Sequence, residues 1–541
     1  MKIKFYGATE DVTGSNFLVT TENGENFLID CGMFQGSASE EARNRKDFPY
    51  DASQLDFMIL THAHIDHSGR IPKLVKEGFA KTIYATEATI DLVDIMLQDS
   101  AQIQYFDIQW ENKKRQRAGE KLLEPLYDSY DVVEAMRLFE PHYYGEMVEI
   151  TPNIRMRFQD AGHILGAAIV ELWITESDKT TKVVFSGDLG MHNHLLIRDP
   201  SYIDAADLVV LESTYGNTVH DDYQNSLDNL MRVINSTTGK GGTVIIPSFA
   251  IGRTQELLYE MNKYYEYGGH ANPRHVPIYV DSPMATKATA VFMRHTDLLD
   301  EEAQGLVKRG DNIFDFPNLV YTRSVEESKA LNLNRAPKVI ISASGMCTGG
   351  RVRHHLKYNI WDPLSAIIFV GYQAIGTLGR IILDGIEDKV KIAGAWLDVK
   401  ASIYSMPGFS AHADKPALLD WLDGFKTKPK QVVLVHGESR EMLPLKKNIE
   451  ENFGINVAIP RYGDELDFLG EKTHLSTSID ISTPDILEMG RLIDEVGRMM
   501  GSWEDRPHDL YELSEEQLSD MQMILTQIKK NMLDLNMVTG K

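Results

Sequence analysis

The sequence predicts an α/β fold in which a parallel-sheet domain is inserted into a strand-rich domain and a helical extension follows. Three observations support this. Short apolar runs separated by turn residues come first, strand-like and helix-like segments alternate from about residue 213, and apolar strands resume near Val390. Regular alternation is typical of βαβ units around a parallel sheet. Because strands resume after it, we expect the alternating region to be an insertion. The expected domains are residues 1–212, 213–390, 391–470 and 471–541.

The bulk composition fits a globular protein of several domains. Of the 541 residues, 43% are hydrophobic and 25% are charged, which is ordinary for such proteins. The formal net charge of −24 argues against non-specific coating of DNA, but it allows a nuclease whose groove alone is positive. Only Cys31 and Cys347 are present, so we expect no disulfide framework and a reducing, cytoplasmic setting. We also expect no signal peptide and no membrane span, because no long uncharged apolar run occurs.

The strand-rich domain is expected from short apolar runs, several of which end beside Gly, Asp or His. Functional residues are commonly placed in this way at the ends of buried strands. Residues 72–77 and 86–100 have apolar positions at helical spacing, and the charged segment 110–125 has the composition of a solvated surface helix or loop. The expected strands are 2–6, 15–20, 26–30, 57–61, 154–158, 168–174, 182–186 and 208–211.

The later domains follow two different patterns. In the insertion, the expected strands are 243–247, 277–280, 338–342 and 366–370, and the expected helices are 225–235, 253–266 and 350–357. The tail from about residue 476 has apolar side chains at helical spacing, namely Leu518, Met521, Leu525, Ile528, Met532 and Leu535. Such a row must be buried, either in this chain or against a second copy, and we favour a homodimer contact.

Residues 61–69, with the sequence THAHIDHSG, contain three histidines and one aspartate directly after an apolar strand. Imidazole and carboxylate groups are ligands of catalytic zinc, and packing alone rarely brings three imidazoles onto one turn. His62 and His64 can reach one ion from an extended turn. Asp66 and His67 project differently and suit a second ion.

Three further segments supply candidate ligands near the ends of expected strands. His163 lies between two glycines in DAGHILG, Asp188 follows a strand in FSGDLG, and His436 ends the run VVLVH. Each alone is weak evidence, because a single histidine at a strand end is commonly structural. Together with residues 61–69 they complete two ligand sets, and two ions held close together can clamp the attacking and leaving oxygens of a phosphoryl displacement. The expected sets are His62, His64 and His163 for one zinc ion, Asp66, His67 and His436 for the other, and Asp188 between them.

These motifs resemble those of the metallo-β-lactamase superfamily, and the later ones resemble its β-CASP subgroup of nucleic-acid-processing enzymes. The superfamily-like segments carry Asp30, residues 61–69, His163 and Asp188, and the subgroup-like segments are LESTYG with Glu212, FSAHAD with His412 and VHGE with His436. The resemblance covers roughly residues 1–470. It looks closest to the cleavage-and-polyadenylation-type ribonucleases and their prokaryotic relatives, since RNA-acting members have His at the position of His436. It implies a metallo-β-lactamase αββα sandwich with an inserted β-CASP domain.

The resemblance also implies a zinc-dependent ribonuclease with two zinc ions, which hydrolyses single-stranded RNA in RNA processing or decay. A hydroxide bridging the metals would be the nucleophile, with Asp66 and Asp188 at the reacting centre, and the products would carry 5′-phosphate and 3′-hydroxyl ends. We expect His412 to be the general acid for the departing 3′ oxygen, and Glu212 to orient it and keep it protonated. Asp30 is expected to brace the histidine turn rather than to bind metal. Endonuclease and 5′-to-3′ exonuclease action both stay open.

Five residues in family-like segments are candidates for RNA contact: Arg253, Ser344, Arg351, Arg353 and Arg380. The cationic stretch 349–357, GGRVRHHLK, fits phosphate binding at a helix start as well as it fits a solvated helix. Two other functions are weighed. A hydrolase of another ester or thioester would lack the insertion with Glu212 and His412, and a non-catalytic RNA-binding subunit would have lost metal ligands that this chain retains.

Overall fold

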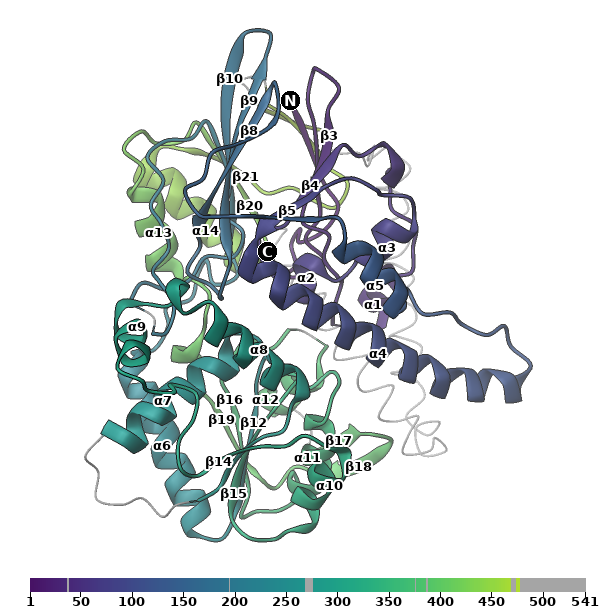
Figure 1. Ribbon diagram of the computed structural model, residues 1–541, viewed down its shortest axis with the longest axis vertical. Coiled ribbons are helices and arrows are strands. Elements are labelled where there is room, and N and C mark those ends of the chain that lie inside the picture. Colours follow the sequence, from purple (N-terminus) through teal and green to yellow (C-terminus); the bar gives the residue numbers. More distant parts are fainter. Residues whose placement is uncertain are drawn as a thin grey trace, which may run out of the picture. The chain divides into compact units, whose positions relative to one another are not determined.

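The computed structural model describes residues 1–36, 38–193, 195–267, 276–374, 376–385, 388–468 and 473–476 (Figure 1). These residues lie in the first of two compact units of the chain, Met1–Thr477. The predicted helical extension 471–541 lies outside the described residues, apart from one strand at its start, and so does the dimer contact expected there. Among the described helices none is both long and apolar enough to cross a membrane.

Two mixed sheets form the strand-rich domain. The first has the order β23-β22-β1-β2-β3-β4-β5-β6, and the second has the order β21-β20-β11-β10-β9-β8-β7. The strands of the first sheet are β1 (Lys2–Phe5), β2 (Phe17–Thr20), β3 (Asn26–Ile29), β4 (Phe57–Ile59), β5 (Ile83–Thr86), β6 (Phe139–His142), β22 (Glu465–Phe468) and β23 (Thr473–Ser476). Those of the second are β7 (Val148–Thr151), β8 (Ile154–Asp160), β9 (Ala168–Glu176), β10 (Lys179–Phe185), β11 (Leu208–Glu212), β20 (Gln431–Val435) and β21 (Asn456–Ala458).

The two sheets pack against each other through alternate apolar side chains. Phe5, Phe27 and Ile59 of the first sheet share a fully buried cluster with Val170 and Val433 of the second. Helices cover the two outer faces of this sandwich (Figure 1). They are α1 (Ala38–Arg43), α2 (Ile65–Ser68), α3 (Ile71–Lys76), α4 (Glu87–Ala118) and α5 (Ser129–Met136) on one side, and α13 (Lys415–Asp423) and α14 (Ser439–Phe453) on the other. The αββα layering expected from the resemblance is confirmed.

The inserted domain is built on a parallel sheet of order β14-β13-β15-β12-β16-β19. Its strands are β12 (Thr243–Pro247), β13 (Ile278–Val280), β14 (Leu319–Tyr321), β15 (Lys338–Ser342), β16 (Ala366–Phe369) and β19 (Ser402–Ser405). A hairpin of β17 (Lys389–Ile392) and β18 (Ala395–Asp398) lies beside it. The helices are α6 (Tyr223–Gly239), α7 (Arg253–Tyr267), α8 (Pro283–Arg294), α9 (Glu301–Lys308), α10 (Val325–Leu333), α11 (Val352–Asn359) and α12 (Leu378–Asp384), with the 3-10 turn η2 (Thr296–Leu298). Two further 3-10 turns are η1 (Ala52–Gln54), in the strand-rich domain, and η3 (Pro407–Phe409), which follows β19.

Two boundaries differ from expectation. Strand β19 pairs with β16, so the inserted sheet continues past residue 390, where we expected the insertion to end. Helix α4 runs on to Ala118 instead of ending near residue 100. Its charged last turns are supported by the Glu111–Arg115 pair one turn apart, and Gly119 ends the helix in the left-handed conformation, with a φ of 72°.

The inserted sheet directs its carboxyl edge toward the strand-rich domain. All strands of this sheet run parallel, so the loops that follow β12, β15 and β16 emerge at one edge. Phe249, in the loop after β12, has its ring centroid 6.1 Å from that of His64. The edge of the insertion therefore faces the histidine turn of residues 61–69.

Candidate metal centre

The turn that carries the first three candidate ligands follows directly from β4. The chain is still extended at His62, and His64 precedes the first residue of α2, so Asp66 and His67 lie within that short helix. His62 and His67 are buried. Gly32 packs so closely under the turn that a Cβ there would lie 1.5 Å from the Asp66 carbonyl oxygen. The backbone therefore holds the turn in one conformation.

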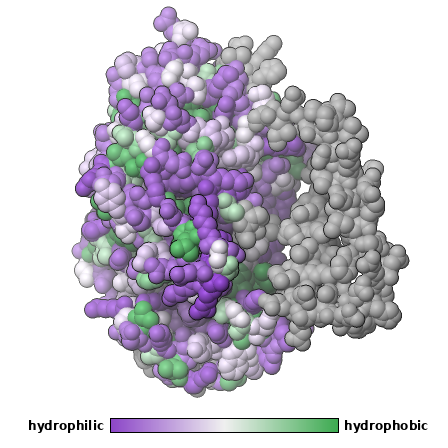
Figure 2. Space-filling model, turned by 90° about the vertical axis from the view of Figure 1, so that its right-hand side faces the viewer, coloured by the Kyte–Doolittle hydropathy of each residue, from purple (hydrophilic) through white to green (hydrophobic). Residues whose placement is uncertain are grey.

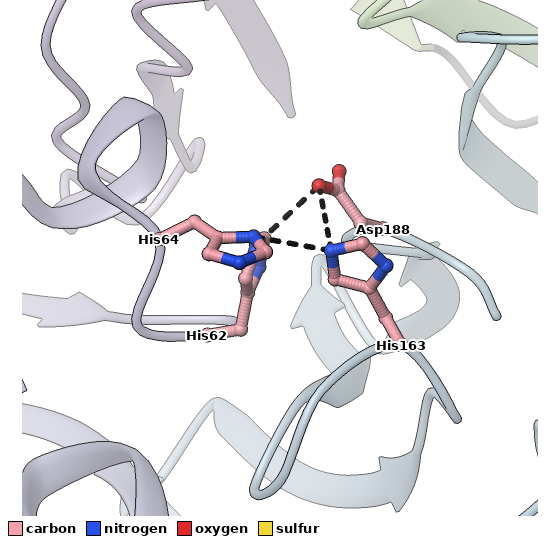
Figure 3. Close-up of side chains that lie close together, drawn as sticks. All are labelled: His62, His64, His163 and Asp188. Atoms are coloured by element: carbon pink, nitrogen blue, oxygen red, sulfur yellow. Dashed lines mark hydrogen bonds and ion pairs between the residues drawn. The ribbon is translucent and has the colours of Figure 1, made fainter. Parts of the chain in front are cut away.

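One group of side chains converges from three segments (Figure 3). His64 Nδ1 lies 3.2 Å from His62 Nε2 and 3.1 Å from His163 Nε2. The Oδ2 atom of Asp188 lies 3.3 Å from His62 Nε2 and 3.6 Å from His163 Nε2. The four ligand-type atoms all lie within 4.8 Å of one another.

A second group lies next to the first. Asp66 Oδ2 is 3.4 Å from His436 Nε2 and 4.0 Å from His67 Nε2. The other oxygen of Asp188, Oδ1, is 3.3 Å from His67 Nε2 and 3.6 Å from His436 Nδ1. Each carboxylate oxygen of Asp188 thus faces a different group, and buried Oδ1 has no hydrogen-bond partner among the residues that the structure describes. We call the seven residues of both groups the His/Asp cluster: His62, His64, Asp66, His67, His163, Asp188 and His436.

Four histidines of the cluster have Nδ1 held by a neighbouring oxygen. The pairs are His62 with the Thr61 hydroxyl at 3.1 Å, His67 with Asp30 at 2.7 Å, His163 with the Ala411 carbonyl at 3.4 Å and His436 with the Thr214 hydroxyl at 3.0 Å. An oxygen partner of this kind fixes the imidazole tautomer and leaves Nε2 with a lone pair, as is usual in metal-ligating histidines. The donor set fits metal ions.

The protonation states of the first group favour metal binding. Burial lowers the pKa of His62 to about 3 and that of His64 to about 4, and it lowers the pKa of His163 as well. These three imidazoles are therefore neutral at pH 7, the form that binds metal. In the second group burial alone would lower the pKa values of His67 and His436, but neighbouring carboxylates, above all Asp188, raise them, so metal binding there displaces protons. Burial alone would raise the pKa of Asp188, but His436, His67 and His62 hold it well below its usual range. The cluster thus offers lone pairs and anionic oxygens together.

Asp30 lies beneath the histidine turn, outside the cluster. Its Oδ1 accepts the backbone N–H of Thr61 at 2.8 Å, and its Oδ2 accepts the Thr61 hydroxyl at 2.9 Å and His67 Nδ1–H at 2.7 Å. Asp30 has a φ of 60°, which is uncommon outside glycine and is best tolerated by Asp and Asn. Its carboxylate contacts the turn and a ligand-type histidine at once.

His412 and Glu212 lie at the side of the cluster. Both oxygens of the fully buried Glu212 face His412 Nδ1, at 3.2 and 3.3 Å. Glu212 is itself held by the N–H of Leu189 and the hydroxyl of Thr214, each at 2.6 Å. Burial alone would lower the pKa of His412, but Glu212 outweighs it and raises the pKa to about 9. His412 is therefore protonated at neutral pH, with Nε2–H turned away from Glu212.

Hydrogen bonds from His220 also hold the loop that carries His412. His220 Nε2–H donates to the His412 carbonyl oxygen at 3.2 Å, and the His220 backbone N–H donates to Asp414 at 3.0 Å. The His220 ring packs edge-on against Tyr215, with centroids 4.4 Å apart. Two hydrogen bonds from His220 thus hold the backbone of His412 and the side chain of Asp414, on either side of Ala413.

The five candidate RNA-contact residues mostly have partners within the protein. Arg253 is 4% exposed and pairs with Glu256, so its guanidinium is turned away from solvent. Arg351 Nη1 lies 2.6 Å from buried Asp281, and Arg380 Nε lies 2.8 Å from Asp384. The remaining two are in one loop, where Arg353 Nη1 donates to the Thr348 carbonyl and the Ser344 hydroxyl accepts the Thr348 N–H. The burial of Arg253 against Glu256 contradicts its predicted contact with RNA.

Sequence reasoning missed several residues that support the cluster. Thr61 directly precedes His62 and Thr214 follows Glu212 by two positions, so their places inside the motifs were a usable signal. The Ala411 carbonyl and His220 gave no such signal, because their partners lie far away in the sequence. Phe249 was inside a family-like segment, but nothing in that segment indicated contact with His64.

Three family models match the chain. The metallo-beta-lactamase superfamily model matches residues 10–234, the Beta-Casp domain model matches 254–382, and the model of a Zn-dependent metallo-hydrolase RNA specificity domain matches 396–460. All seven residues of the His/Asp cluster fall within the first and third of these ranges, as do Glu212 and His412.

Curated relatives match over most of the chain. Ribonuclease TTHA0252 of Thermus thermophilus is 39% identical over 464 residues, which cover 86% of this chain and 99% of the relative. Transcription termination factor FttA of Methanocaldococcus jannaschii is 31% identical, covering 85% of this chain and 70% of the relative. The FttA protein of Thermococcus kodakarensis is 32% identical, covering 86% and 71%.

Proposed function

This chain belongs to the β-CASP family of metallo-β-lactamase-fold ribonucleases, and on that premise we propose that it hydrolyses single-stranded RNA at the His/Asp cluster with the help of two zinc ions. The observation that carries the proposal is the convergence of seven ligand-type side chains beside a protonated histidine, His412. A similar family member, Ribonuclease TTHA0252, has RNA cleavage in its name and is matched over 99% of its length.

We propose two metal positions, supported by the two groups of ligand-type side chains. We assign His62, His64 and His163 to one ion and Asp66, His67 and His436 to the other. Asp188 would contact both, since each of its oxygens faces one group. Zinc bound there would supply positive charge against the phosphate and a water molecule of lowered pKa.

His412 is the proposed general acid. Its Nδ1 faces Glu212, so the proton on Nε2 is the one it can give to the departing 3′ oxygen. Glu212 keeps His412 charged until that step, and the N–H of Leu189 and the hydroxyl of Thr214 keep Glu212 in place. Cleavage with proton donation to the 3′ oxygen gives 3′-hydroxyl and 5′-phosphate ends.

The experiment compares the cleavage of end-labelled RNA with the cleavage of matching DNA. Zinc-loaded full-length protein is incubated with single-stranded RNA labelled at either end, carrying a 5′-hydroxyl or a 5′-monophosphate, and with matching DNA. RNA should be cleaved much faster than DNA. Internal fragments would indicate an endonuclease, and mononucleotides released from the 5′ end would indicate an exonuclease.

A control excludes contaminating nucleases. His62→Ala protein purified in the same way should be inactive, because it lacks one ligand. Equal rates on RNA and DNA, or activity retained in His62→Ala, would contradict the proposal.

Two further expectations stay as proposals. We place the protein in the cytoplasm, since an RNA substrate and the free, buried Cys31 and Cys347 fit a reducing compartment. We also propose that residues 476–541 contact a second copy of the chain, supported by the helical spacing of their apolar residues. Light scattering of the full-length chain, which should give the mass of a dimer, tests the second proposal.

A further inference from the structure

The C-terminal half of α4 carries a row of large side chains at its surface. Ile103, Phe106 and Trp110 are 42%, 59% and 62% exposed. Their spacing of three and four residues places them on one side of the helix, and exposed cations continue that row. We call the row the α4 stripe: Ile103, Phe106, Trp110, Lys113, Lys114 and Arg117.

The stripe is not part of the packing that holds α4 to the protein. The buried positions of α4 end at Ala101, apart from Ile108, which is on the opposite side from the stripe. The face of the molecule drawn in Figure 2 is mostly hydrophilic, with apolar groups scattered over it. Contiguous exposed apolar patches with a polar rim mark interaction sites.

The chemistry of the stripe fits nucleic acid. Lys114 Nζ lies over the Trp110 ring, 3.5 Å from its centroid, so an aromatic ring and a cation lie together at the surface of the helix. Proteins bind single strands by stacking bases on aromatic rings and pairing phosphates with nearby cations. The end of α4 is basic in a chain of net charge −24, because residues 113–121 contain Lys113, Lys114, Arg115, Arg117 and Lys121 against Glu120.

The stripe begins where α4 faces the inserted domain beside the metal centre. Phe249, which contacts His64, packs against Gly345 in the loop that leads to Arg351. Asp99 of α4 is close enough to Arg351 for their charges to interact, and Ile103 follows Asp99 by one helical turn on the same side. A strand leaving the His/Asp cluster past this loop would reach the stripe next.

On the basis of the proposed function, we propose that the α4 stripe is a platform for single-stranded RNA outside the cleavage site. Bases of the strand stack on Phe106 and Trp110, and the phosphates between them contact Lys113, Lys114 and Arg117. The platform lengthens the RNA footprint without touching the bond that is cleaved.

The double variant Phe106→Ala/Trp110→Ala of the full-length protein tests the platform. For a long unstructured RNA we expect KM to rise about 10-fold or more for each ring lost, with kcat unchanged, because stacking adds affinity and not chemistry. Hydrolysis of bis(p-nitrophenyl) phosphate, a phosphodiester too small to reach α4, should stay at the wild-type rate.

Trp361→Ala is the matched control. Trp361 is 41% exposed and carries Arg335 over its ring, as Trp110 carries Lys114, but it follows α11 at the sheet edge that is away from the His/Asp cluster. It should leave both activities unchanged. A second variant, Lys113→Gln/Lys114→Gln/Arg117→Gln, should make RNA binding less salt-dependent, lowering the slope of log affinity against log salt by roughly 0.7 per lost phosphate contact.

The outcomes separate this proposal from the proposed function. Wild-type protein that hydrolyses the small ester but no RNA would refute the ribonuclease. If the wild type cleaves RNA and the double variant has the same KM for RNA as Trp361→Ala, the platform alone is refuted. Loss of both activities in the double variant would show that the two rings support the fold of the catalytic domain. A double variant whose mass by light scattering differs from that of the wild type, with RNA cleavage unchanged, would show that the rings contact another protein chain. Either result overturns the platform.

Discussion

Asp188 connects two groups of imidazoles through a single carboxylate. Its Oδ2 lies 3.3 Å from His62 Nε2, and its Oδ1 lies 3.3 Å from His67 Nε2. Gly187 before it has a φ of 56°, so the chain turns sharply after β10 and brings the carboxylate back between the imidazoles. On the proposed assignment, one side chain would therefore decide whether both metal positions can be filled.

Asp188→Asn should remove that shared anion while keeping the shape of the side chain. We expect the variant to lose at least one of two zinc ions and most RNA cleavage, because an amide nitrogen cannot bind zinc and an amide oxygen carries no charge. Elemental analysis per chain after gel filtration measures the loss. Asp204→Asn, at an exposed residue paired with Lys426, should keep the wild-type zinc content. Two zinc ions in Asp188→Asn would contradict the bridging role.

His412→Ala should keep both metals and lose turnover by ~10²–10⁴-fold, the usual contribution of general acid catalysis. The acid must be protonated, so the wild-type rate should fall as pH rises through about 9, the pKa of His412. Glu212→Gln removes the charge that raises this pKa, and the alkaline limb of its pH–rate profile should move to lower pH. The measurement is kcat/KM against pH for all three proteins.

The controls for His412 are its metal content and the direction of the pH shift. Asp188 and His436 also lie within ligand distance of His412 and Glu212. A His412→Ala protein short of zinc would show that His412 is a ligand and not an acid. An alkaline limb that stays in place in Glu212→Gln would show that Glu212 does not set the charge of His412.

The candidate ligands could be named from the sequence because several of them share one short motif, residues 61–69. Their tautomers could not be named in the same way. The oxygen that holds His163 is the carbonyl of Ala411, which lies 248 positions away and has no side-chain signal. The RNA contacts were the weakest expectation, since the sequence cannot tell that Arg253 is buried against Glu256.

At the scale of the elements, close backbone contacts decide where the loops of the site lie. Gly190, after β10, packs against the loop of His163, and a Cβ there would lie 1.7 Å from the Gly162 carbonyl oxygen. Gly190→Ala should therefore destabilise the fold by about 1–3 kcal/mol, as overpacking usually does, and weaken zinc binding by moving His163. Urea denaturation and zinc titration measure the two effects.

Gly305→Ala is the opposite case within the same protein. Gly305 lies inside α9 with open space where its Cβ would be. Because alanine is the better helix former, the change should stabilise the protein by up to about 1 kcal/mol without altering zinc binding. Equal stabilities for the two variants would show that the Gly190 contact does not constrain the loop.

The positions of the strands could be predicted more accurately than the ends of helices and the boundaries of domains. Apolar runs bounded by polar residues locate β12 and β15 at the expected residues. The end of α4 was missed because residues 111–118 have no apolar period, and their helix depends on charge pairs and a terminal glycine. The limit of the insertion was missed because β19 is short and mostly exposed, so that its pairing with β16 has little sequence signal.

At the scale of the whole molecule, the His/Asp cluster joins parts of the chain that the insertion separates. Residues 61–69, His163 and Asp188 precede the inserted domain, whereas His436 follows it at the end of β20. Loops at the edge of the inserted sheet contact the cluster through Phe249. Metal ions held by the cluster would therefore connect both parts of the sandwich, and their binding energy would add to the stability of the fold.

Removing zinc should lower the melting temperature of the protein as well as its activity. A ligand that binds only the folded state stabilises it by about 2.7 kcal/mol at a free concentration 100 times its Kd, and two such ions act together. Without them, the anionic Asp66 and Asp188 lose the cations that would neutralise them. Differential scanning calorimetry before and after chelation should show a fall in Tm that added zinc reverses and magnesium does not, because nitrogen-rich sites favour zinc. An unchanged Tm with abolished RNA cleavage would mean that the ions serve the reaction alone and that the sandwich is held together without them.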